Sequence, residues 1–309
     1  MAELKKYKYK SCEYTFLDNA LTPYWEGAVK WVPLWVAPNL ITFVGWLLII
    51  VSYVNILRYD YTLQKDVPNY CFILTAFCVW AYSTLDAIDG KQARRTKSSS
   101  PLGQLFDHGC DSFSNAFFVL AMAQAFKLEG YQAILIFIAS QGAFWAASWI
   151  EYHTGVLKTN VGQLGVTEIH IIVTVTHLIT GIFGQKLWQI GINSILPKFL
   201  LSIHPWLEFV GEMKLGGFII TTFGLLFAVL TFAQIFIVIL KSGEKVKLLM
   251  ECCSIGLIVL LEFIWVGFSF FDQYRGLVLL NFGLFSSLII CKTIISAVTK
   301  VYCRIFRCR

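Results

Sequence analysis

Charged residues are scarce in this sequence: Asp, Glu, Lys and Arg make up only 14% of its 309 residues. An ordinary soluble domain carries about 25% charged residues, whereas 57% of this chain is hydrophobic and 16% is aromatic. This composition argues against a soluble globular domain. Because the Lys and Arg residues are spread over the polar connections, the sequence predicts no nucleic-acid module and no nucleic-acid partner.

Three other signals are missing. The basic start, MAELKKYKYK, is not followed by a short apolar run with a small-residue cleavage site, so we expect no cleaved signal peptide. The nine cysteines lack the paired spacing of a disulfide framework or a zinc site, and we expect free thiols. No fixed-period repeat or low-complexity tract occurs, which excludes solenoids and biased linkers.

Long apolar runs are what the sequence does contain. A bilayer core needs about 20 mostly apolar residues per helical span. Eight runs meet this, near residues 38–57, 69–88, 105–126, 131–150, 166–184, 215–240, 248–271 and 276–298. Residues 14–36 mix aromatic and polar positions, which is typical of a helix lying in the membrane interface. We therefore predict an all-α, polytopic integral membrane protein with about eight transmembrane helices and an N-terminal interfacial amphipathic helix.

The distribution of basic residues predicts the orientation in the membrane. With the N-terminus in the cytosol, seventeen Lys and Arg residues fall on the cytosolic side and seven on the opposite side. This asymmetry agrees with the positive-inside rule. The net charge of +6 also suits contact with anionic membrane lipids.

Four aspartates stand out against this apolar background. Asp86 and Asp89 are spaced i, i+3 at the end of the second run, and Asp107 and Asp111 are spaced i, i+4 at the start of the third, so each pair shares one helix face. The connection between the two runs is short, so we expect antiparallel neighbouring helices that direct both pairs into one pocket. Four carboxylates in one pocket cannot all stay ionised without cations. Hard oxygen ligands favour Mg²⁺ or Mn²⁺ over zinc, and four aspartates suffice to hold two ions for phosphoryl transfer.

The plainer alternative is a solvated helix end whose aspartates pair with Arg94, Arg95 and Lys97. A single DxxD motif would favour that interpretation. The full pattern is D(x)2DG(x)2AR(x)8G(x)3D(x)3D, and its eight fixed positions make a chance match improbable. They are Asp86, Asp89, Gly90, Ala93, Arg94, Gly103, Asp107 and Asp111.

This pattern resembles the signature of the CDP-alcohol phosphatidyltransferase family. The longer run DAIDGKQARRTKSSSPLGQLFDHGCDS, with APNLIT at 37–42 and VTEIH at 166–170, is similar to the eukaryotic choline/ethanolamine phosphotransferase branch. The resemblance implies transfer of phosphocholine or phosphoethanolamine from CDP-choline or CDP-ethanolamine to diacylglycerol, with release of CMP. It implies a cytosolic N-terminus and interfacial helix (1–36), catalytic helices (37–184) and C-terminal membrane helices with a basic tail (185–309). It further implies an endoplasmic reticulum or Golgi membrane with the active site facing the cytosol.

Residue roles follow in part from chemistry and in part from the resemblance. The metal ligands are Asp86, Asp89, Asp107 and Asp111. Arg94 suits a phosphate because its guanidinium is a planar donor fork, and Gly90 and Gly103 permit close approach of a nucleotide. The resemblance places Asn39 at a nucleotide-contacting position, although a helix N-cap explains it nearly as well. Gln104 stands where the branch usually has glutamate, which removes a charge from the donor site.

Deprotonation of the diacylglycerol hydroxyl requires a base. His108 follows the third aspartate directly, and an imidazole suits general-base work near neutral pH. The related branch pairs this histidine with a glutamate that corresponds to Glu168. The wider family is usually described with the fourth aspartate, here Asp111, as the base. We favour His108 and leave Asp111 as the alternative.

Other functions remain open at this point. A phosphatidyltransferase of the same family could use CDP-diacylglycerol as donor with an inositol-type acceptor. A transporter would need polar residues continuing across the bilayer, and these runs are almost wholly apolar beyond the aspartates. Because the branch typically has about ten spans, a non-catalytic short isoform is a further alternative. The sequence leaves open choline against ethanolamine, and a homodimer against a monomer.

Overall fold

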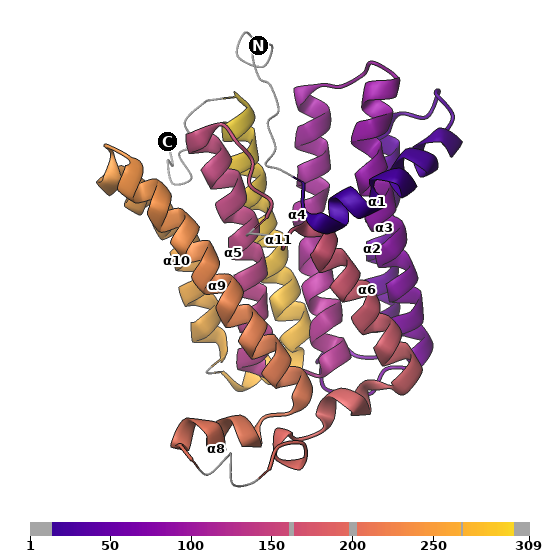
Figure 1. Ribbon diagram of the computed structural model, residues 1–309. Coiled ribbons are helices and arrows are strands. Elements are labelled where there is room, and N and C mark those ends of the chain that lie inside the picture. Colours follow the sequence, from indigo (N-terminus) through magenta and orange to yellow (C-terminus); the bar gives the residue numbers. More distant parts are fainter. Residues whose placement is uncertain (1–13, 161–163, 198–202, 267, 300–309) are drawn as a thin grey trace.

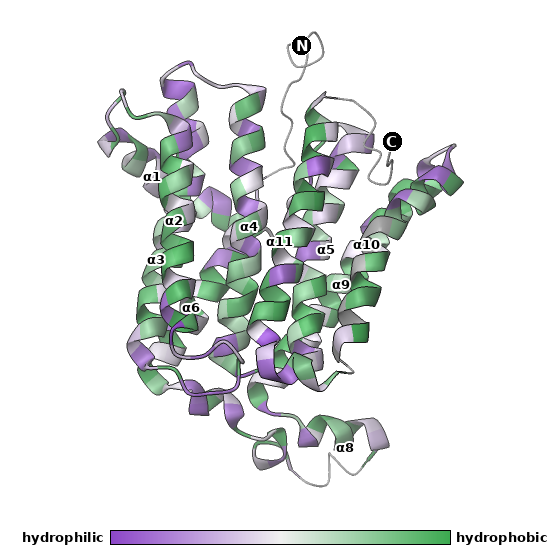
Figure 2. Ribbon diagram, turned by 180° about the vertical axis from the view of Figure 1, so that it is seen from behind, coloured by the Kyte–Doolittle hydropathy of each residue, from purple (hydrophilic) through white to green (hydrophobic). Residues whose placement is uncertain are grey.

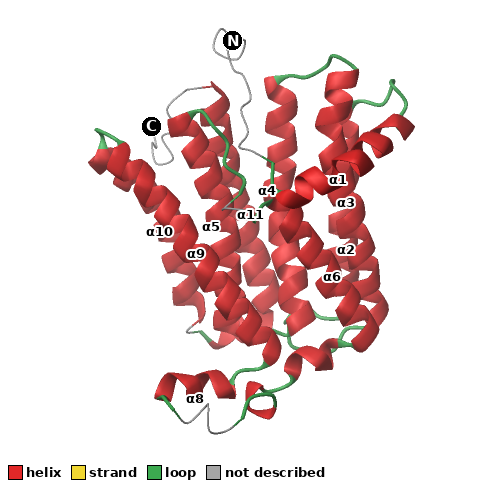
Figure 3. Cartoon of the chain, in the orientation of Figure 1, coloured by secondary structure: helices red, strands yellow, loops and turns green. Residues whose placement is uncertain are grey.

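The computed structural model describes residues 14–160, 164–197, 203–266 and 268–299. Within these ranges the regular secondary structure is helical, with isolated bridge residues such as the pair Gly191 and Lys214 and no β-strand (Figure 3). The α-helices are α1 (Phe16–Ala28), α2 (Pro38–Leu57), α3 (Asn69–Arg95), α4 (Pro101–Phe126), α5 (Gly130–Thr154), α6 (Val166–Phe183), α8 (Pro205–Glu212), α9 (Leu215–Lys241), α10 (Lys245–Val266) and α11 (Ser269–Thr299). Short 3₁₀ helices are η1 (Val29–Trp31), η2 (Gln185–Gln189) and η3 (Ile192–Ser194). The predicted all-α class is confirmed.

The eight predicted apolar runs correspond to eight long helices, α2 to α6 and α9 to α11. Among the described residues, six helices are long and apolar enough to cross a membrane: α2, α3, α5, α6, α9 and α11. Helices α4 and α10, with 26 and 22 residues, fall outside this set. Both could still reach across a core about 30 Å thick, because a helix rises 1.5 Å per residue. The polytopic membrane class is confirmed, with six spans supported where about eight were predicted.

The long helices form two groups that meet along α4 (Figure 1). Helix α2 packs on α3 and α4, and α3 packs on α6; on the other side α5 packs between α9 and α11. The two groups join where α4 contacts α11 and α5. Helices α8, η2 and η3 lie at one end of the bundle, whereas α1, η1 and the α3–α4 connection lie at the other, which we call the aspartate end.

Helix α9 is the least buried of the six candidate spans, and we expect its exposed surface to face lipid. Only 17% of its most apolar 18-residue window is buried, against 39–56% for the other five candidate spans. Large apolar side chains such as Phe223, Phe232 and Phe236 are exposed along it, and Figure 2 shows α9 and α10 as mostly hydrophobic ribbons. In lipid such a surface needs no protein partner, because the acyl chains are as apolar as the side chains.

Helix α1 is fastened to the aspartate end of the bundle. Its N-terminus carries a capping box, in which Thr15 Oγ1 accepts from the Asp18 N–H at 3.2 Å and Asp18 Oδ2 accepts from the Thr15 N–H at 3.0 Å. Trp25 and Val29 pack with Ile88 of α3 in a small apolar cluster. The predicted N-terminal helix is therefore present, and its position in the membrane interface remains a prediction.

Candidate functional site

The aspartates lie where α3 ends and α4 begins. Helix α3 continues to Arg95, past the apolar run, and α4 starts at Pro101 with Ser100 as its N-cap, whose Oγ accepts from the Gly103 N–H at 3.1 Å. Only residues 96–100 connect them. Helix α2 packs extensively on both, whereas α3 and α4 scarcely touch each other. The aspartate pairs of α3 and α4 therefore face each other, and α2 packs between the two helices and keeps them apart.

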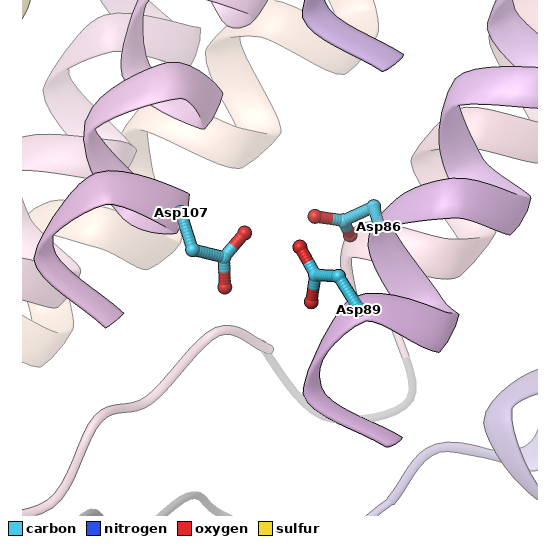
Figure 4. Close-up of side chains that lie close together, drawn as sticks. All are labelled: Asp86, Asp89 and Asp107. Carbon is cyan, nitrogen blue, oxygen red and sulfur yellow. The ribbon is translucent and has the colours of Figure 1, made fainter. Parts of the chain in front are cut away.

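Three of the four aspartates form a compact cluster. Asp86 and Asp89 extend from α3 toward Asp107 on α4 (Figure 4). One carboxylate oxygen from each of the three lies within 4.8 Å of the other two. Asp111 lies close enough to Asp86 for the two carboxylates to interact electrostatically, as Asp107 and Asp89 do. The structure therefore brings together all four residues predicted as metal ligands.

Two hydroxyl groups that the sequence interpretation missed complete the cluster. Thr42 Oγ1 of α2 donates a short hydrogen bond to Asp89 Oδ2. Tyr82 Oη donates to Asp111 Oδ1 at 2.5 Å. Thr42 belongs to the APNLIT segment, and Tyr82 lies one helical turn before Asp86, so each carried a weak signal. These hydroxyls orient two carboxylates and leave the remaining oxygens for a ligand.

The plainer interpretation, in which Arg94, Arg95 and Lys97 neutralise the aspartates, is disfavoured for Arg95. Arg95 Nη1 instead donates to the carbonyl oxygens of Val29 and Val32, the latter at 3.2 Å. None of the ion pairs found within the described parts of the chain includes an aspartate of the cluster. Arg95 thus fastens η1 to α3 and does not balance the cluster's charge.

The predicted nucleotide-binding residues surround the cluster at the aspartate end. A Cβ atom placed on Gly90 would lie 3.6 Å from Arg94 Nη1, so the guanidinium lies over this glycine. A Cβ on Gly103 would lie 3.6 Å from Asn39 Oδ1, which places Asn39 of α2 against the first turn of α4. The N-cap of α2 is Ala37, so Asn39 does not serve as the cap. Gln104 is half-buried in the same first turn of α4.

His108 and Glu168, the predicted base and its partner, come from different helices. His108 is half-buried on α4 between Asp107 and Asp111. Glu168 lies in the first turn of α6, where its oxygens accept from the Gly165 N–H at 2.9 Å and the Leu17 N–H at 3.3 Å. Glu168 therefore joins α6 to the start of α1. This is a structural role that the sequence did not indicate, and its role as partner of His108 remains a prediction.

The donor set fits a hard divalent cation. All the clustered ligands are carboxylate oxygens, and Asp107 Oδ1 is buried without a hydrogen-bond partner. Buried carboxylates at such short separations repel one another unless a cation lies between them. Oxygen ligands of this kind suit Mg²⁺ or Mn²⁺.

A search of protein-family models matches residues 35–240 to the CDP-alcohol phosphatidyltransferase family. The chain therefore belongs to that family, and the predicted class of enzyme, a phosphotransferase, is confirmed.

Relatives of named function align with nearly the whole chain. Cholinephosphotransferase 1 of Danio rerio is 31% identical over 97% of this chain and 77% of its own length. Cholinephosphotransferase 1 of Xenopus laevis is 35% identical over 97% of this chain and 73% of its own length. An uncharacterized CDP-alcohol phosphatidyltransferase class-I family protein 2 of Dictyostelium discoideum is 40% identical over 64% of this chain and 48% of that protein. The chain is thus similar to cholinephosphotransferases from end to end, and its alignment spans about half of the Dictyostelium protein.

Proposed function

We propose that this protein transfers phosphocholine from CDP-choline to diacylglycerol, giving phosphatidylcholine and CMP. The observation that carries the proposal is the four-aspartate cluster between α3 and α4, within a chain that aligns almost completely with cholinephosphotransferases. CDP-ethanolamine is the alternative donor, because the two alcohols differ only in methylation of the amine.

Each group at the site has a role in this reaction. Asp86, Asp89, Asp107 and Asp111 would hold two Mg²⁺ or Mn²⁺ ions, which supply positive charge to the pyrophosphate of the donor. Arg94 binds a phosphate oxygen above Gly90, where the missing Cβ leaves room. Asn39, Gly103 and Gln104 line the approach of the nucleotide at the start of α4.

A base next to the cluster accepts the proton of the acceptor. We assign this role to His108, which lies on the same helix as Asp107 and Asp111. The diacylglycerol oxygen then attacks the phosphorus that bears choline, and CMP leaves with the electrons of the broken P–O bond. Asp111 is the alternative base, and its hydrogen bond from Tyr82 would then hold it in place.

The aspartate end would face the cytosol in an endoplasmic reticulum or Golgi membrane. This placement gives a water-soluble CDP-alcohol direct access to the cluster, while the lipid acceptor arrives through the bilayer. The basic residues predicted for the cytosolic side support it. A homodimer fits the proposal equally well, since the site is built from one chain.

Purified protein in detergent micelles tests the function. It is incubated with diacylglycerol, Mg²⁺ and either CDP-choline or CDP-ethanolamine, and the lipid product is identified by mass spectrometry. We expect phosphatidylcholine with the first donor, loss of turnover in excess chelator, and recovery on addition of Mg²⁺ or Mn²⁺. A third reaction with CDP-diacylglycerol and inositol tests the competing member of the family. No product from any donor would support a non-catalytic protein and refute the proposal.

A further inference from the structure

The apolar core of the bundle is divided by a layer of polar side chains. One core cluster contains α4 from Ala116 onward and α5 up to Phe137. The second contains α5 from Trp145 onward and α11 from Ile289 onward. Several polar residues lie between them, and we call five of these the polar belt: Ser112 and Asn115 of α4, Ser140 and Gln141 of α5, and Ser287 of α11.

The serines of the polar belt have partners within the protein. Ser140 Oγ donates to Asn115 Oδ1 at 2.7 Å, and Ser287 Oγ lies 2.7 Å from the carbonyl oxygen of Ser112. Ser112 Oγ donates to the carbonyl oxygen of Gly109 at 2.8 Å. The first two bonds join α4 to α5 and α11, and the third lies within α4, so all three serines have a hydrogen-bond partner.

The two amides of the polar belt are different. Gln141 is 2% exposed, and neither its Nε2 nor its Oε1 has a hydrogen-bond partner. Asn115 Nδ2 is also buried without a partner, although its Oδ1 is bonded. A buried amide left unpaired costs about 1–3 kcal/mol, and no water is present in a bilayer core to reduce that cost. Such groups within a membrane usually mark a ligand path.

Asn115 lies beside the aspartate cluster, and Gln141 lies on the neighbouring helix α5. Asn115 follows Asp111 by four residues, so it lies on the same face of α4, one turn of about 5.4 Å deeper in the bundle. Gln141 follows Phe137 by four residues on α5. The face that Phe137 occupies points to α4 and α11, because a Cβ on Gly283 would lie 2.7 Å from Phe137 Cζ and 2.6 Å from Ala116 Cβ. Asn115 therefore continues the face of Asp111 into the apolar interior, and Gln141 lies on the face of α5 that borders α4 and α11.

We propose that Asn115 and Gln141 bind the ester carbonyl groups of the diacylglycerol acceptor, an inference that rests on the proposed function. The acceptor must place its hydroxyl at the aspartate cluster while its acyl chains stay in the bilayer. Its two ester groups, attached to the glycerol carbons one and two positions from the hydroxyl-bearing carbon, would then place their carbonyls on the membrane side of the cluster, at the depth of the polar belt. A carbonyl oxygen accepts hydrogen bonds and the amide NH₂ groups donate them, so the ester carbonyls would supply the missing partners of Asn115 Nδ2 and Gln141 Nε2.

The test compares a diester with a diether acceptor. Dioleoylglycerol and its dioleyl diether analogue share the hydroxyl and the chain length, but the ether lacks both carbonyls. For the wild-type protein we expect the KM for the diether to be about 3- to 10-fold higher than for the diester, the range for one or two neutral hydrogen bonds. In Asn115→Leu and Gln141→Leu we expect the diester KM to rise by a similar factor while the diether KM stays unchanged. The KM for CDP-choline should be unaffected.

Asn55→Leu is the matched control, because Asn55 Nδ2 is also buried but lies near the far end of α2. It should keep the diester preference. Equal KM values for the two acceptors in the wild-type protein would overturn the inference without any variant, which guards against variants that fail to fold. Equal losses on both acceptors in Asn115→Leu and Gln141→Leu would also overturn it. Absence of transfer by the wild-type protein to either acceptor would instead refute the proposed function itself, and the inference with it.

Discussion

The four aspartates of the cluster do not have equal surroundings. Asp89 and Asp111 each accept a hydrogen bond from a hydroxyl, whereas Asp107 Oδ1 is buried without any partner. An unpartnered buried carboxylate oxygen lowers the stability of the protein alone, and a bound cation would remove that cost. Asp107 is therefore the residue whose geometry is hardest to explain without a metal.

Asp107→Asn should abolish transfer and leave the fold intact. The amide is a poor cation ligand, and replacing one of several repelling carboxylates relieves repulsion. We expect turnover to fall by about 100-fold or more, with no loss of thermal stability in a detergent melt. Glu244→Gln, an exposed carboxylate at the start of α10, is the control and should retain activity. A large drop in melting temperature for Asp107→Asn would indicate a structural role instead.

Thr42→Val tests the hydroxyl from α2. Valine keeps the shape of threonine but removes the donor to Asp89 Oδ2. Groups that orient a metal ligand typically account for about 10- to 100-fold in metal affinity or activity, so we expect a loss in that range that raised Mg²⁺ partly restores. Thr42→Ser should keep most of the activity because it keeps the hydroxyl. Loss of activity in both variants would assign Thr42 to packing.

His108→Ala distinguishes the two candidate bases. Loss of a general base lowers kcat by about 10²- to 10⁴-fold, while binding of CDP-choline, measured directly, should survive. Asp111→Asn should weaken metal binding instead. Were His108→Ala to turn over at nearly the wild-type rate, the base would be Asp111.

Within single elements, Asp60 organises the connection between α2 and α3. Although 3% exposed, it accepts hydrogen bonds from the Thr62 N–H and Oγ1 and from the Gln64 and Lys65 N–H groups, at 2.6–2.8 Å. Burial alone would raise the pKa of this carboxyl, but these hydrogen bonds outweigh burial and hold the pKa below its ordinary value. The charged carboxylate therefore stabilises the turn that sets where α3 begins.

Asp60→Asn should destabilise the protein in a pH-dependent way. Because the folded pKa is lowered, the contribution is complete above the unfolded pKa near 3.9 and is lost as pH falls through the folded pKa. At neutral pH we expect a loss of about 1–3 kcal/mol, seen as a lower melting temperature that converges with wild type in strong acid. Asp66→Asn, in the same connection but with a 69% exposed side chain, should change little. A pH-independent difference would contradict the assignment.

The elements themselves were largely predictable from the sequence, because apolar runs of bilayer length dictate helices. What hydropathy could not locate is the end of α3, which the run places at 88 and the structure at Arg95. The segment DAIDGKQARR is polar but contains good helix formers, so the helix continues past the membrane core. The i, i+3 and i, i+4 spacing predicted for the same reason that the aspartates come together, and their role as metal ligands stays a prediction.

The contacts across the site were less predictable. Thr42 is hydrogen-bonded to Asp89, 47 residues later in the sequence, and Leu17 to Glu168, 151 residues later. Such pairs depend on how α1, α2 and α6 pack around α3, and local periodicity carries no information on that packing. The sequence did not indicate a role for Asn115 and Gln141 for another reason. A single amide within an apolar run is common, and its position between two apolar core clusters is known only from the packing of the helices.

At the scale of the whole molecule, the connections between helices fall into two sets, one at each end of the bundle. The α3–α4 and α9–α10 connections lie at the aspartate end with α1, whereas α8 and the α2–α3 connection lie at the opposite end (Figure 1). Water-soluble donor and lipid acceptor can both reach a cluster placed near one membrane surface. The side on which that surface lies decides which compartment supplies the nucleotide.

Cysteine labelling in sealed microsomes, whose cytosolic face is outward, tests the orientation. Ser98 is exposed in the α3–α4 connection, and Ser194 is exposed in η3 near the opposite end. If the aspartate end faces the cytosol, Ser98→Cys should react with a membrane-impermeant maleimide in intact vesicles, and Ser194→Cys only after detergent opens them. The unsubstituted protein gives the background from native thiols, including the exposed Cys253. The reverse labelling pattern would place the cluster in the lumen and separate it from cytosolic CDP-choline, in conflict with the proposed function, because a charged nucleotide does not cross a bilayer unaided.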